Sequence, residues 1–369
     1  MDRLKLLIKP LVCRKNKVYA DRDMISPDTA PKNLSEDALK AIKSLTDDII
    51  EARENKRSVM LTFGAHTIKN GMAPTLIAML ERGFFTHYAT NGAGIIHDWE
   101  IAYQGRTSED VRANVCKGEF GTWEETGFYL NLALNVGAWQ GLGYGESVGH
   151  MVFHGGLMIP ALNELEAFTL DNYHIEPGRV AAAMDLCEII RKFNLRPGFM
   201  EIRHEYPQLG IQSAALRLGI PFTAHPMFGH DIIYTHPMNY GASIGRVAEC
   251  DFLSFADSVT NLSGGVYLSV GSAVMSPMVF EKSMSMAQNL ALQNKKKISG
   301  HKIYVVDLAT SNWDWNKQGE PPMDNPAYYL RYCKTFSRMG GNMTYVTADN
   351  RDFLLALYQQ LSRNVQNTI

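Results

Sequence analysis

Residues 59–111 read VMLTFGAHTIKNGMAPTLIAMLERGFFTHYATNGAGIIHDWEIAYQGRTSEDV. Val59 to Phe63 is an apolar run of strand length, Gly71 to Arg82 has apolar residues at helical spacing, and Phe85 to Thr90 is a second strand. The second strand leads directly into Asn91-Gly92-Ala93-Gly94. This order predicts a βαβ unit. Ligands of open parallel sheets bind beyond the carboxyl ends of such strands.

The remainder of the chain alternates between strand-like and helix-like segments. Expected strands are GFMEI (198–202), PFTAH (221–225), GVYLSV (265–270), KIYVVDLAT (302–310) and MTYVT (343–347). Expected helices lie near 208–218, at 277–293, from 326 and at 349–362. The alternation predicts an α/β protein with a Rossmann-like, mainly parallel sheet and helices on both faces.

The first 57 residues differ from this pattern. They are mixed and polar, and a serine-capped amphipathic helix is expected from Ser35 to Asn55. We expect residues 1–57 to form an N-terminal helical arm. Residues 58–369 show no repeat and no break in composition, so they are expected to form a single α/β domain.

Composition excludes several classes of protein. The chain has 369 residues, of which 46% are hydrophobic and 20% charged, as in ordinary globular proteins. A net charge of −2 offers no basic face for nucleic acid. The apolar LKLLIKPLV run near the N-terminus is too short for a membrane span. Five widely spaced cysteines without a CxxC pair favour a reducing compartment, so a cytoplasmic protein is expected.

Two glycine clusters invite a nucleotide-binding interpretation. Asn91-Gly92-Ala93-Gly94 has the first two glycines of a G-x-G-x-x-G fingerprint but lacks the third. It can provide a phosphate or ribose contact, or it can be a turn that requires positive φ, and the pattern leaves both open. Gly141-Leu142-Gly143-Tyr144-Gly145 follows a helical stretch, which favours a loop or close helix packing.

The eleven histidines raise the question of a metal site. His150 and His154 are four residues apart, and a loop-rich segment contains His225, His230 and His236. Neither group has an established zinc spacing, and no HExxH motif is present. Structural or substrate-facing histidines are therefore favoured, and no metal is expected. A serine nucleophile is disfavoured because no G-x-S-x-G elbow occurs.

Seven segments in the same order give the chain a resemblance to a known family. They are SVMLTFGAHTIKNG, THYATNGAGIIHDWE, GHDIIYTH, GGVYLSVGSAVM, IYVVDLATSNWDWN, PAYYLRYCK and YVTADNRDFLLALYQQ. Together they resemble the deoxyhypusine synthase family and its bacterial relatives of unassigned activity, over residues 58 to 363. The family's small-residue loop followed by acids matches Asn91 to Asp98, its G-D-hydrophobic-aromatic-His run matches 230–236, and its A-D pair matches Ala348-Asp349.

The resemblance implies a homotetramer that binds NAD at paired subunit interfaces. Family members oxidise a secondary amine with NAD, capture the aminobutyl group as an imine on a lysine, and pass it to an acceptor amine. The resemblance assigns cofactor contacts to His66, Lys69, Asn91, Gly92, Ala93, Gly94, His97, Asp98, Asp231, Gly271, Ser272, Ala309 and Asp349. Catalytic roles fall on Lys334, Tyr332 and Asp314.

Lys334 is identified by its spacing from Pro326 and Tyr332, which matches the family's nucleophilic lysine. Without the resemblance, a solvent-facing lysine on an amphipathic helix is the simpler interpretation. An amine nucleophile requires a depressed pKa. We expect Trp313 and Trp315 to form an apolar wall that lowers it, unless cation–π contact stabilises the ammonium instead.

Several positions depart from the family pattern. Ser276-Pro277-Met278 replaces a histidine pair, His97 replaces the acid that holds the ribose, and Tyr332 replaces a tryptophan. The polyamine-binding acids are reduced to Asp314, Glu320 and Asp324. These changes predict an NAD-dependent enzyme with an amine substrate and a reaction other than deoxyhypusine formation.

Two alternatives remain. In one, His66, Lys69, His97 and Asp98 bind a phosphorylated or carboxylated molecule and no NAD is needed. The other is a non-catalytic nucleotide-binding protein.

Overall fold

The computed structural model describes residues 1–366, and the chain divides into two compact units. Unit 1 comprises Met1–Arg22, Gly92–Gly219 and Pro226–Asp251, and unit 2 comprises Asp23–Asn91, Ile220–His225 and the residues from Phe252 onward. This division differs from the expected boundary at residue 58. Residues 1–22 belong to unit 1, whereas the serine-capped helix of the expected arm belongs to unit 2.

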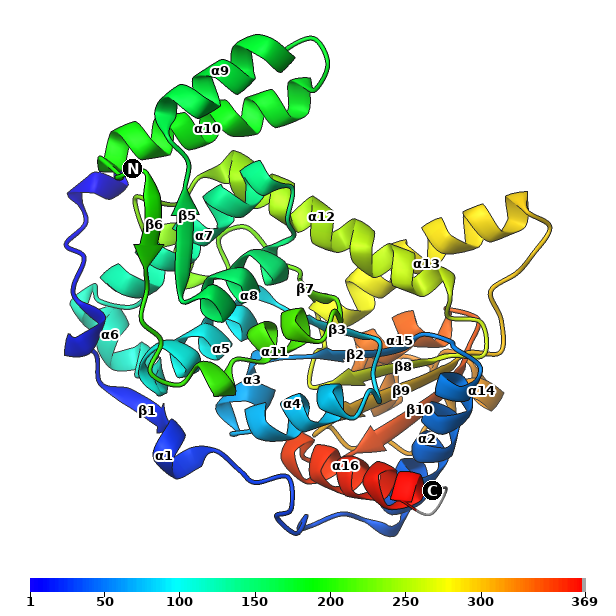
Figure 1. Cartoon of the computed structure of the whole chain (residues 1–369). Helices are drawn as coiled ribbons and strands as arrows, with labels where there is room; N and C mark the ends of the chain where they lie inside the picture. Colours follow the sequence, from blue (N-terminus) through cyan, green and yellow to red (C-terminus); the bar gives the residue numbers. More distant parts are fainter. Residues whose placement is uncertain (367–369) are drawn as a thin grey trace. The chain divides into compact units, whose positions relative to one another are not determined.

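Unit 2 is built on a six-stranded, all-parallel sheet (Figure 1). The strands are β2 (Val59–Phe63), β3 (His87–Thr90), β7 (Phe222–Ala224), β8 (Val266–Val270), β9 (Lys302–Asp307) and β10 (Asn342–Thr347). Their order across the sheet is β10-β9-β8-β2-β3-β7. Numbered along the chain and read from β7, this is the 3-2-1-4-5-6 order of doubly wound dinucleotide-binding folds. The predicted Rossmann-like fold class is confirmed.

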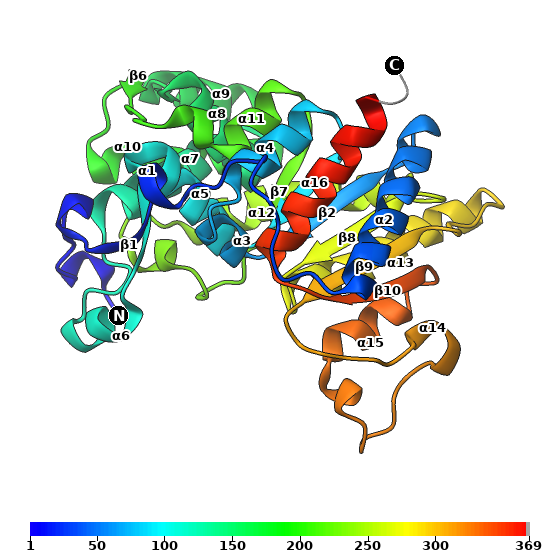
Figure 2. The same cartoon turned by 90° about the horizontal axis from the view of Figure 1, so that it is seen from below.

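Helices cover both faces of this sheet. On one face lie α2 (Glu36–Glu54), α4 (Ala73–Glu81) and α16 (Asn350–Gln366), with α2 and α16 side by side (Figure 2). The other face carries the second half of α12 (Gly241–Thr260), α13 (Met275–Gln293), α14 (Trp315–Gln318) and α15 (Arg331–Ser337). The short α3 (Ala65–Lys69) follows β2, and a 3₁₀ turn, η5 (Pro326–Tyr329), precedes α15.

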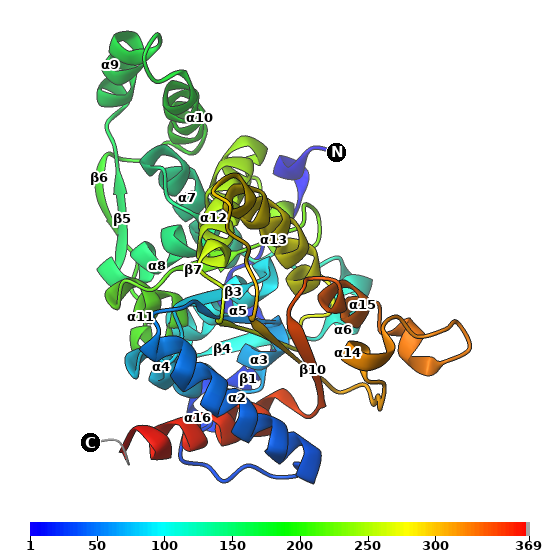
Figure 3. The ribbon, with the colours of Figure 1, turned by 90° about the vertical axis from the view of Figure 1, so that its right-hand side faces the viewer.

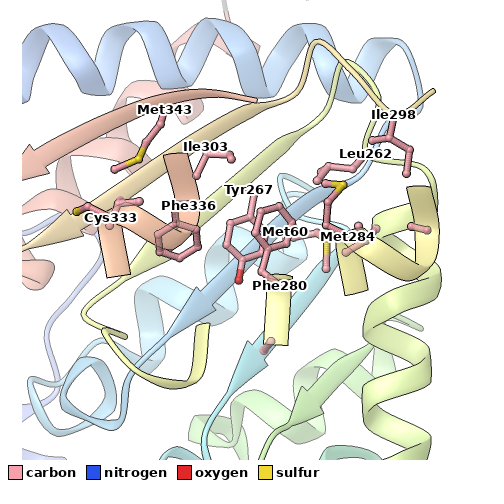
Figure 4. Packing of buried hydrophobic residues seen from close by; sticks show 14 of the residues in the cluster. Met60, Leu262, Tyr267, Phe280, Met284, Ile298, Ile303, Cys333, Phe336 and Met343 are labelled. Atoms are coloured by element: carbon pink, nitrogen blue, oxygen red, sulfur yellow. The ribbon is translucent and has the colours of Figure 1, made fainter. Parts of the chain in front are cut away.

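The alternation of side chains along β9 shows how the two faces are packed. Ile303 and Val305 join the apolar cluster under α12, α13 and α15, which Figure 4 shows from close by. In that cluster the rings of Tyr267 and Phe280 stack with centroids 4.0 Å apart. Tyr304 points to the opposite face, where its hydroxyl donates to Asp48 of α2 at 2.6 Å. β2, β3 and β8 are buried throughout, as expected for central strands covered on both faces.

Unit 1 is mainly helical. Its helices are α1 (Ala20–Asp23, whose last residue falls in unit 2), α5 (Gly92–Gln104), α6 (Val111–Lys117), α7 (Glu124–Gln140), α8 (Tyr144–His154), α9 (Leu162–Asn172), α10 (Pro177–Phe193) and α11 (Ile211–Arg217). Its 3₁₀ turns are η1 (Arg3–Lys5), η2 (Leu11–Cys13), η3 (Pro207–Leu209) and η4 (Ile232–Thr235). Two antiparallel pairs join β1 (Asn16–Tyr19) to β4 (Arg106–Glu109) and β5 (Gly156–Ile159) to β6 (Gly198–Glu201). α9 and α10 pack together beyond the ends of β5 and β6 (Figure 3).

Three local expectations need correction. The GFMEI segment forms β6, which pairs with β5 in unit 1 and is not part of the parallel sheet. The glycines after β3 do not form a loop, because α5 begins at Gly92. The helix expected from Pro326 is a 3₁₀ turn followed by α15. Within residues 1–366, no helix is both long and apolar enough to cross a membrane.

Candidate functional site

The carboxyl ends of β2 and β8 meet in the middle of the unit 2 sheet, where the strand order reverses. Here a Cβ atom on Gly64 would lie 2.1 Å from the carbonyl oxygen of Gly271. Gly271 has a φ of +58°, a left-handed conformation that glycine adopts without strain. The backbones therefore approach too closely for a side chain. Ligands of doubly wound sheets bind outside the strand ends at this switch point.

A cavity of about 260 Å³ lies at the same edge of the sheet. It is lined by His66, Asn70, Gly271, Val306, Asp307, Leu308, Ala348, Asp349 and Asn350. These residues follow β2, β8, β9 and β10, so all four strands contribute their carboxyl ends. Pockets for whole ligands span roughly 300–1,000 Å³. The cavity therefore suits one portion of a dinucleotide.

Two carboxylates give this cavity its chemical character. Asp307 ends β9 and accepts a hydrogen bond from the backbone N–H of Ala309 at 3.3 Å. Asp349 precedes α16 and accepts one from the backbone N–H of Arg351 at 2.9 Å. A carboxylate can accept about four hydrogen bonds, so each retains capacity for the hydroxyls of a ribose or for an ammonium group.

Polar side chains between α3 and α16 complete the lining. The amide of Asn70 donates to Oδ1 of Asn350 at 2.8 Å, and the amide of Asn350 lies 3.3 Å from the hydroxyl of Thr67. Burial and the neighbouring Lys69 lower the pKa of His66. His66 is therefore a neutral donor and acceptor near pH 7 and not a cation.

The predicted cofactor residues of unit 2 fall into two groups. His66, Gly271 and Asp349 line the cavity. Lys69 ends α3, Asn91 follows β3, Ser272 accepts a hydrogen bond from the backbone N–H of Ser276, and the carbonyl of Ala309 accepts one from Tyr345. Cofactor contacts by all seven residues stay predictions.

The remaining predicted cofactor residues lie in unit 1, around the first turns of α5. Gly92, Ala93 and Gly94 open this helix, and a Cβ on Gly92 would lie 2.0 Å from Oδ2 of Asp231. Gly92 thus allows a carboxyl group to approach the start of the helix. Burial raises the pKa of Asp231 to about 7.

Three buried polar atoms near Asp231 have no hydrogen-bond partner among the described residues: its own Oδ2 and the hydroxyls of Tyr144 and Tyr234. Burial, and secondarily the charge of Asp231, raises the pKa of both phenols. Buried polar atoms are almost always satisfied in native proteins, by water or a ligand if not by protein. This cluster is thus a second place in the chain where water or a polar ligand would satisfy buried atoms.

His97 and Asp98 are used within unit 1. Nδ1 of His97 lies 2.7 Å from the hydroxyl of Thr107. Asp98 accepts hydrogen bonds from the backbone N–H groups of Ile211 and Gln212 and from the Gln212 amide, so it caps the start of α11. Burial outweighs these bonds and raises the pKa of Asp98 to about 6. A ribose contact by either residue stays a prediction.

Lys334, the predicted nucleophile, lies on α15 and pairs with Glu320, which also binds Arg338 at 2.6 Å. Its ammonium lies 5.7 Å from the centre of the Tyr328 ring. The hydrogen bond from Lys334 lowers the pKa of Glu320. The aromatic ring near this ammonium is that of Tyr328, and an apolar wall formed by Trp313 and Trp315 stays a prediction.

The other two predicted catalytic residues have identifiable structural partners. The hydroxyl of Tyr332 lies 3.3 Å from that of Tyr345, and burial raises the pKa of Tyr332 to about 12. Asp314 caps α14 through the N–H groups of Asn316 and Lys317. Their catalytic roles stay predictions.

The histidines that raised a metal hypothesis are placed as follows. His150 and His154 stack on α8 with ring centroids 5.4 Å apart, and His150 lies 3.8 Å from Glu146. Across the described part of the chain, no three His, Cys, Asp or Glu side chains come together as a metal-ion site would require.

Comparison with solved structures returns distant matches. A ternary complex of AgrE with ornithine and NAD⁺ matches at 14% identity and a TM-score of 0.45, over 90% of this chain and 34% of AgrE. ArgZ, an arginine dihydrolase from the ornithine–ammonia cycle in cyanobacteria, matches at 13% and 0.39, over 88% of this chain and 32% of ArgZ. A conserved putative LOR/SDH protein from Methanococcus maripaludis S2 matches at 12% and 0.43, over 92% and 74% of the two chains.

The chain thus spans about a third of the length of AgrE and ArgZ. No family model matches it, and no curated protein matches it. Membership of the deoxyhypusine synthase family stays a prediction.

The sequence analysis did not identify four residues at the carboxyl edge of the unit 2 sheet: Gly64, Asn70, Asp307 and Asn350. Two carried a signal, because Gly64 follows one apolar strand run and Asp307 ends another. Asn70 and Asn350 bind each other across 280 positions of sequence, which a local pattern cannot reveal.

Proposed function

We propose that this protein is an NAD-dependent enzyme that acts on an amine. The observation that carries the proposal is the contact of Gly64 with Gly271 at the switch point of a 3-2-1-4-5-6 sheet, beside an acid-lined cavity. Doubly wound folds hold dinucleotides at this switch point, where a glycine lets the pyrophosphate approach the backbone and a nearby acid binds a ribose diol. The contact of Gly64 with Gly271 packs one backbone against another and so marks the switch point.

Asp307 and Asp349 would hold the ribose hydroxyls, and Gly271 would allow the cofactor to contact the backbone. In the usual arrangement the ribose acid follows the second strand of the sheet. Here the acids follow β9 and β10. When bound, NAD would supply a hydride acceptor for oxidation of the carbon next to the amine nitrogen.

The amine part of the proposal rests on the resemblance and on charged groups in unit 2. Lys334 would capture the oxidised carbon as an imine, while the bond from that carbon to the substrate's own nitrogen breaks and this nitrogen leaves as a free amine. Glu320 would hold the ammonium form of Lys334 until substrate arrives. A cationic substrate can replace Lys334 as the partner of Glu320, which would release the lysine for reaction. Asp314 and Asp324 would contribute further carboxylates for a polyamine.

The cofactor site is tested by calorimetric titration of the full chain with NAD. Asp307→Asn and Asp349→Asn should each weaken binding about tenfold, since each loses a charge-assisted hydrogen bond worth about 1.4 kcal/mol or more. Asp257→Asn, an exposed position on α12, is the control and should bind as wild type does. Absence of NAD binding at millimolar concentration would overturn the proposal.

The covalent step is tested by borohydride trapping. Protein is incubated with NAD and spermidine or putrescine, reduced, and mapped by peptide mass spectrometry. We expect an adduct on the peptide with Lys334, absent from Lys334→Ala and retained in Lys282→Ala, another ion-paired lysine. If turnover is observed and Lys334→Ala retains it, the lysine mechanism is wrong.

A smaller phosphorylated or carboxylated ligand is the alternative that the cavity volume favours. AMP and ADP-ribose titrations separate the two, because an NAD enzyme should bind ADP-ribose at least as well as AMP.

We also propose a homotetramer, from the resemblance and from large exposed apolar side chains such as Leu170, Ile175 and Phe199. A monomeric mass by light scattering at micromolar concentration would contradict it.

A further inference from the structure

A continuous chain of hydrogen bonds runs through unit 2 between the sheet and α12. Oγ of Ser258 lies 2.8 Å from Nδ1 of His87. Nε2 of His87 lies 2.9 Å from the hydroxyl of Thr223, and that hydroxyl lies 3.0 Å from Nε2 of His225. Three hydrogen bonds therefore connect four side chains, which come from α12, β3, β7 and the residue that follows β7.

The middle of this chain is closed to solvent. His87 is 0% exposed and Thr223 is 2% exposed. Phe255 of α12 packs edge-on against both imidazoles, with ring centroids 5.4 Å from His87 and 5.1 Å from His225. The two bonds made by the Thr223 hydroxyl are buried, so water does not replace them, whereas the bond between Ser258 and His87 is partly buried.

Both histidines are neutral at physiological pH. Burial lowers the pKa of each to about 3, and for His87 the neighbouring His225 adds to the effect. A neutral imidazole has one N–H donor and one bare nitrogen acceptor, and a hydroxyl can donate one hydrogen bond while accepting another. The chain therefore alternates groups that can each both donate and accept.

This alternation allows two complete polarities of the same chain. In the first, His225 Nε2–H donates to Thr223, Thr223 donates to His87 Nε2, and His87 Nδ1–H donates to Ser258. In the second, Ser258 donates to His87 Nδ1, His87 Nε2–H donates to Thr223, and Thr223 donates to His225. All three bonds are made in both cases. Conversion of the first polarity into the second leaves every heavy atom in place.

The two ends of the chain lie in different surroundings. Ser258 is partly exposed on α12. His225, 8% exposed, follows β7 immediately, and its backbone N–H donates to the carbonyl of Thr90 at the end of β3. His225 thus lies at the carboxyl edge of the sheet, the edge that carries the candidate site of unit 2.

We propose that Ser258, His87, Thr223 and His225 form a proton relay between solvent and the carboxyl edge of the unit 2 sheet. A proton accepted on Nδ1 of His225 releases the Nε2 proton to Thr223, which passes its own proton to Nε2 of His87. His87 releases its Nδ1 proton to Ser258, which transfers one to water. One proton enters and one leaves, and both imidazoles end neutral in the opposite tautomer.

In the proposed function, on which this role rests, the proton is the one that a substrate ammonium loses before oxidation. His225 would accept this proton at the carboxyl end of β7, and the other three side chains would act through it. A static polar network would instead hold one polarity permanently. The two cases differ in whether the tautomers interconvert and in whether the middle hydroxyl matters for turnover.

The first test needs no activity. Long-range ¹H–¹⁵N spectra of the full chain labelled with ¹⁵N-histidine report the tautomer of each ring, and His87→Asn and His225→Asn assign the signals. We expect averaged Nδ1 and Nε2 shifts for both rings at pH 7, retained in Thr223→Ser and lost in Thr223→Val. A single fixed tautomer in wild type, or averaging that survives Thr223→Val, would overturn the relay.

The second test uses turnover of an amine with NAD. Thr223→Val should lower kcat at least tenfold, leave KM unchanged and alter the solvent deuterium isotope effect, whereas Thr223→Ser should restore all three. Thr75→Val is the matched control, because Thr75 is also fully buried in unit 2 and its hydroxyl has no partner among the described residues. Equal kcat values for Thr223→Val and Thr75→Val would exclude the relay. If the wild-type protein does not bind NAD, only the proposed function is excluded, and the tautomer measurement still tests the relay.

Discussion

Unit 1 and unit 2 both bury polar side chains, and one cluster in each unit shows a different way of doing so. Unit 1 buries ionisable groups: the Arg14–Glu100 pair at 5% and 1% exposure, and Asp98 at 1%. Unit 2 buries a chain of neutral imidazoles and hydroxyls beside β3 and β7. A buried charge requires a partner of opposite sign or several donors, whereas a neutral chain requires only alternating donors and acceptors.

Asp231 of unit 1 and the two histidines of the unit 2 chain respond to pH in opposite directions. Asp231 in unit 1 holds its proton more tightly in the folded state than in the unfolded chain, so its contribution to stability is lost as pH rises. His87 and His225 in unit 2 hold a proton less tightly when folded, so their contribution is lost as pH falls below about 6.5. The pH dependence of the free energy of unfolding can therefore distinguish a variant of Asp231 from a variant of His87 or His225.

The largest expected effect is removal of one partner of the buried charge pair in unit 1. Both terminal nitrogens of Arg14 donate to Glu100, at 2.7 and 2.6 Å. Burial acts to raise the pKa of Glu100, but the pair with Arg14 outweighs it and holds that pKa below its ordinary value. Arg14→Met should lower the free energy of unfolding by about 3–5 kcal/mol, because Glu100 remains buried without its counterion.

Urea denaturation at pH 7 measures this loss. The double variant Arg14→Met with Glu100→Gln is the control, and it should recover part of the stability because no uncompensated charge remains. A loss below about 1 kcal/mol in Arg14→Met would mean that water reaches Glu100, and the contrast between the units would fail.

The next effect concerns Asp231 and depends on pH. Burial raises its folded pKa from 3.8 to about 7, so between pH 4 and pH 7 the folded protein binds a proton that the unfolded chain has released. The free energy of unfolding therefore falls as pH rises through this window. Asp231→Asn cannot titrate, and relative to wild type its free energy of unfolding should rise by on the order of 4 kcal/mol from pH 4 to pH 8.

Urea denaturation at intervals across this window supplies the measurement, with the variant and wild type compared at each pH. Asp110→Asn is the control that should show no pH dependence in this window, because a hydrogen bond from the backbone of Ala113 lowers the pKa of Asp110 below its ordinary value of 3.8, and its effect therefore falls below pH 4. A difference between Asp231→Asn and wild type that stays constant with pH would show that Asp231 is ionised in the folded state.

Features that depend on residues close together in sequence could be predicted, and features that depend on distant residues could not. β2 was predicted at its observed bounds, and α2 with its Ser35 cap, because apolar runs and capping serines act locally. The pairing of β6 with β5 could not be predicted, since a short strand does not specify its partner. The start of α5 at Gly92 was missed because that glycine accommodates Asp231, which is 139 positions away.

The residues of the candidate site likewise divide into those that the sequence could identify and those that only the fold brings together. Resemblance found His66, Gly271 and Asp349, which line the cavity, whereas Asp307 and Asn350 became visible only once β9 and β10 were paired. His225 was noticed as one of several loop histidines. Its connection to His87 through Thr223 depends on the neighbouring positions of β3 and β7, and no spacing in the sequence encodes that.

The smallest expected effect is at the surface of unit 2, where an ion pair is exposed to solvent and not buried like the Arg14–Glu100 pair of unit 1. Glu320 is 37% exposed at its side chain and binds both Lys334 and Arg338. Glu320→Gln should leave the urea midpoint of unfolding close to that of wild type, because solvent screens exposed ion pairs. The same substitution removes the carboxylate that holds the Lys334 ammonium, so Lys334 should become more reactive toward an amine-selective reagent at pH 8. Lys282, paired with Glu281 on α13, serves as the internal reference for labelling by mass spectrometry. A large loss of stability in Glu320→Gln would show that this pair is as essential to folding as Arg14 with Glu100. Unchanged labelling of Lys334 would show that Glu320 does not restrain the lysine, and it would remove the proposed role of this carboxylate in the reaction.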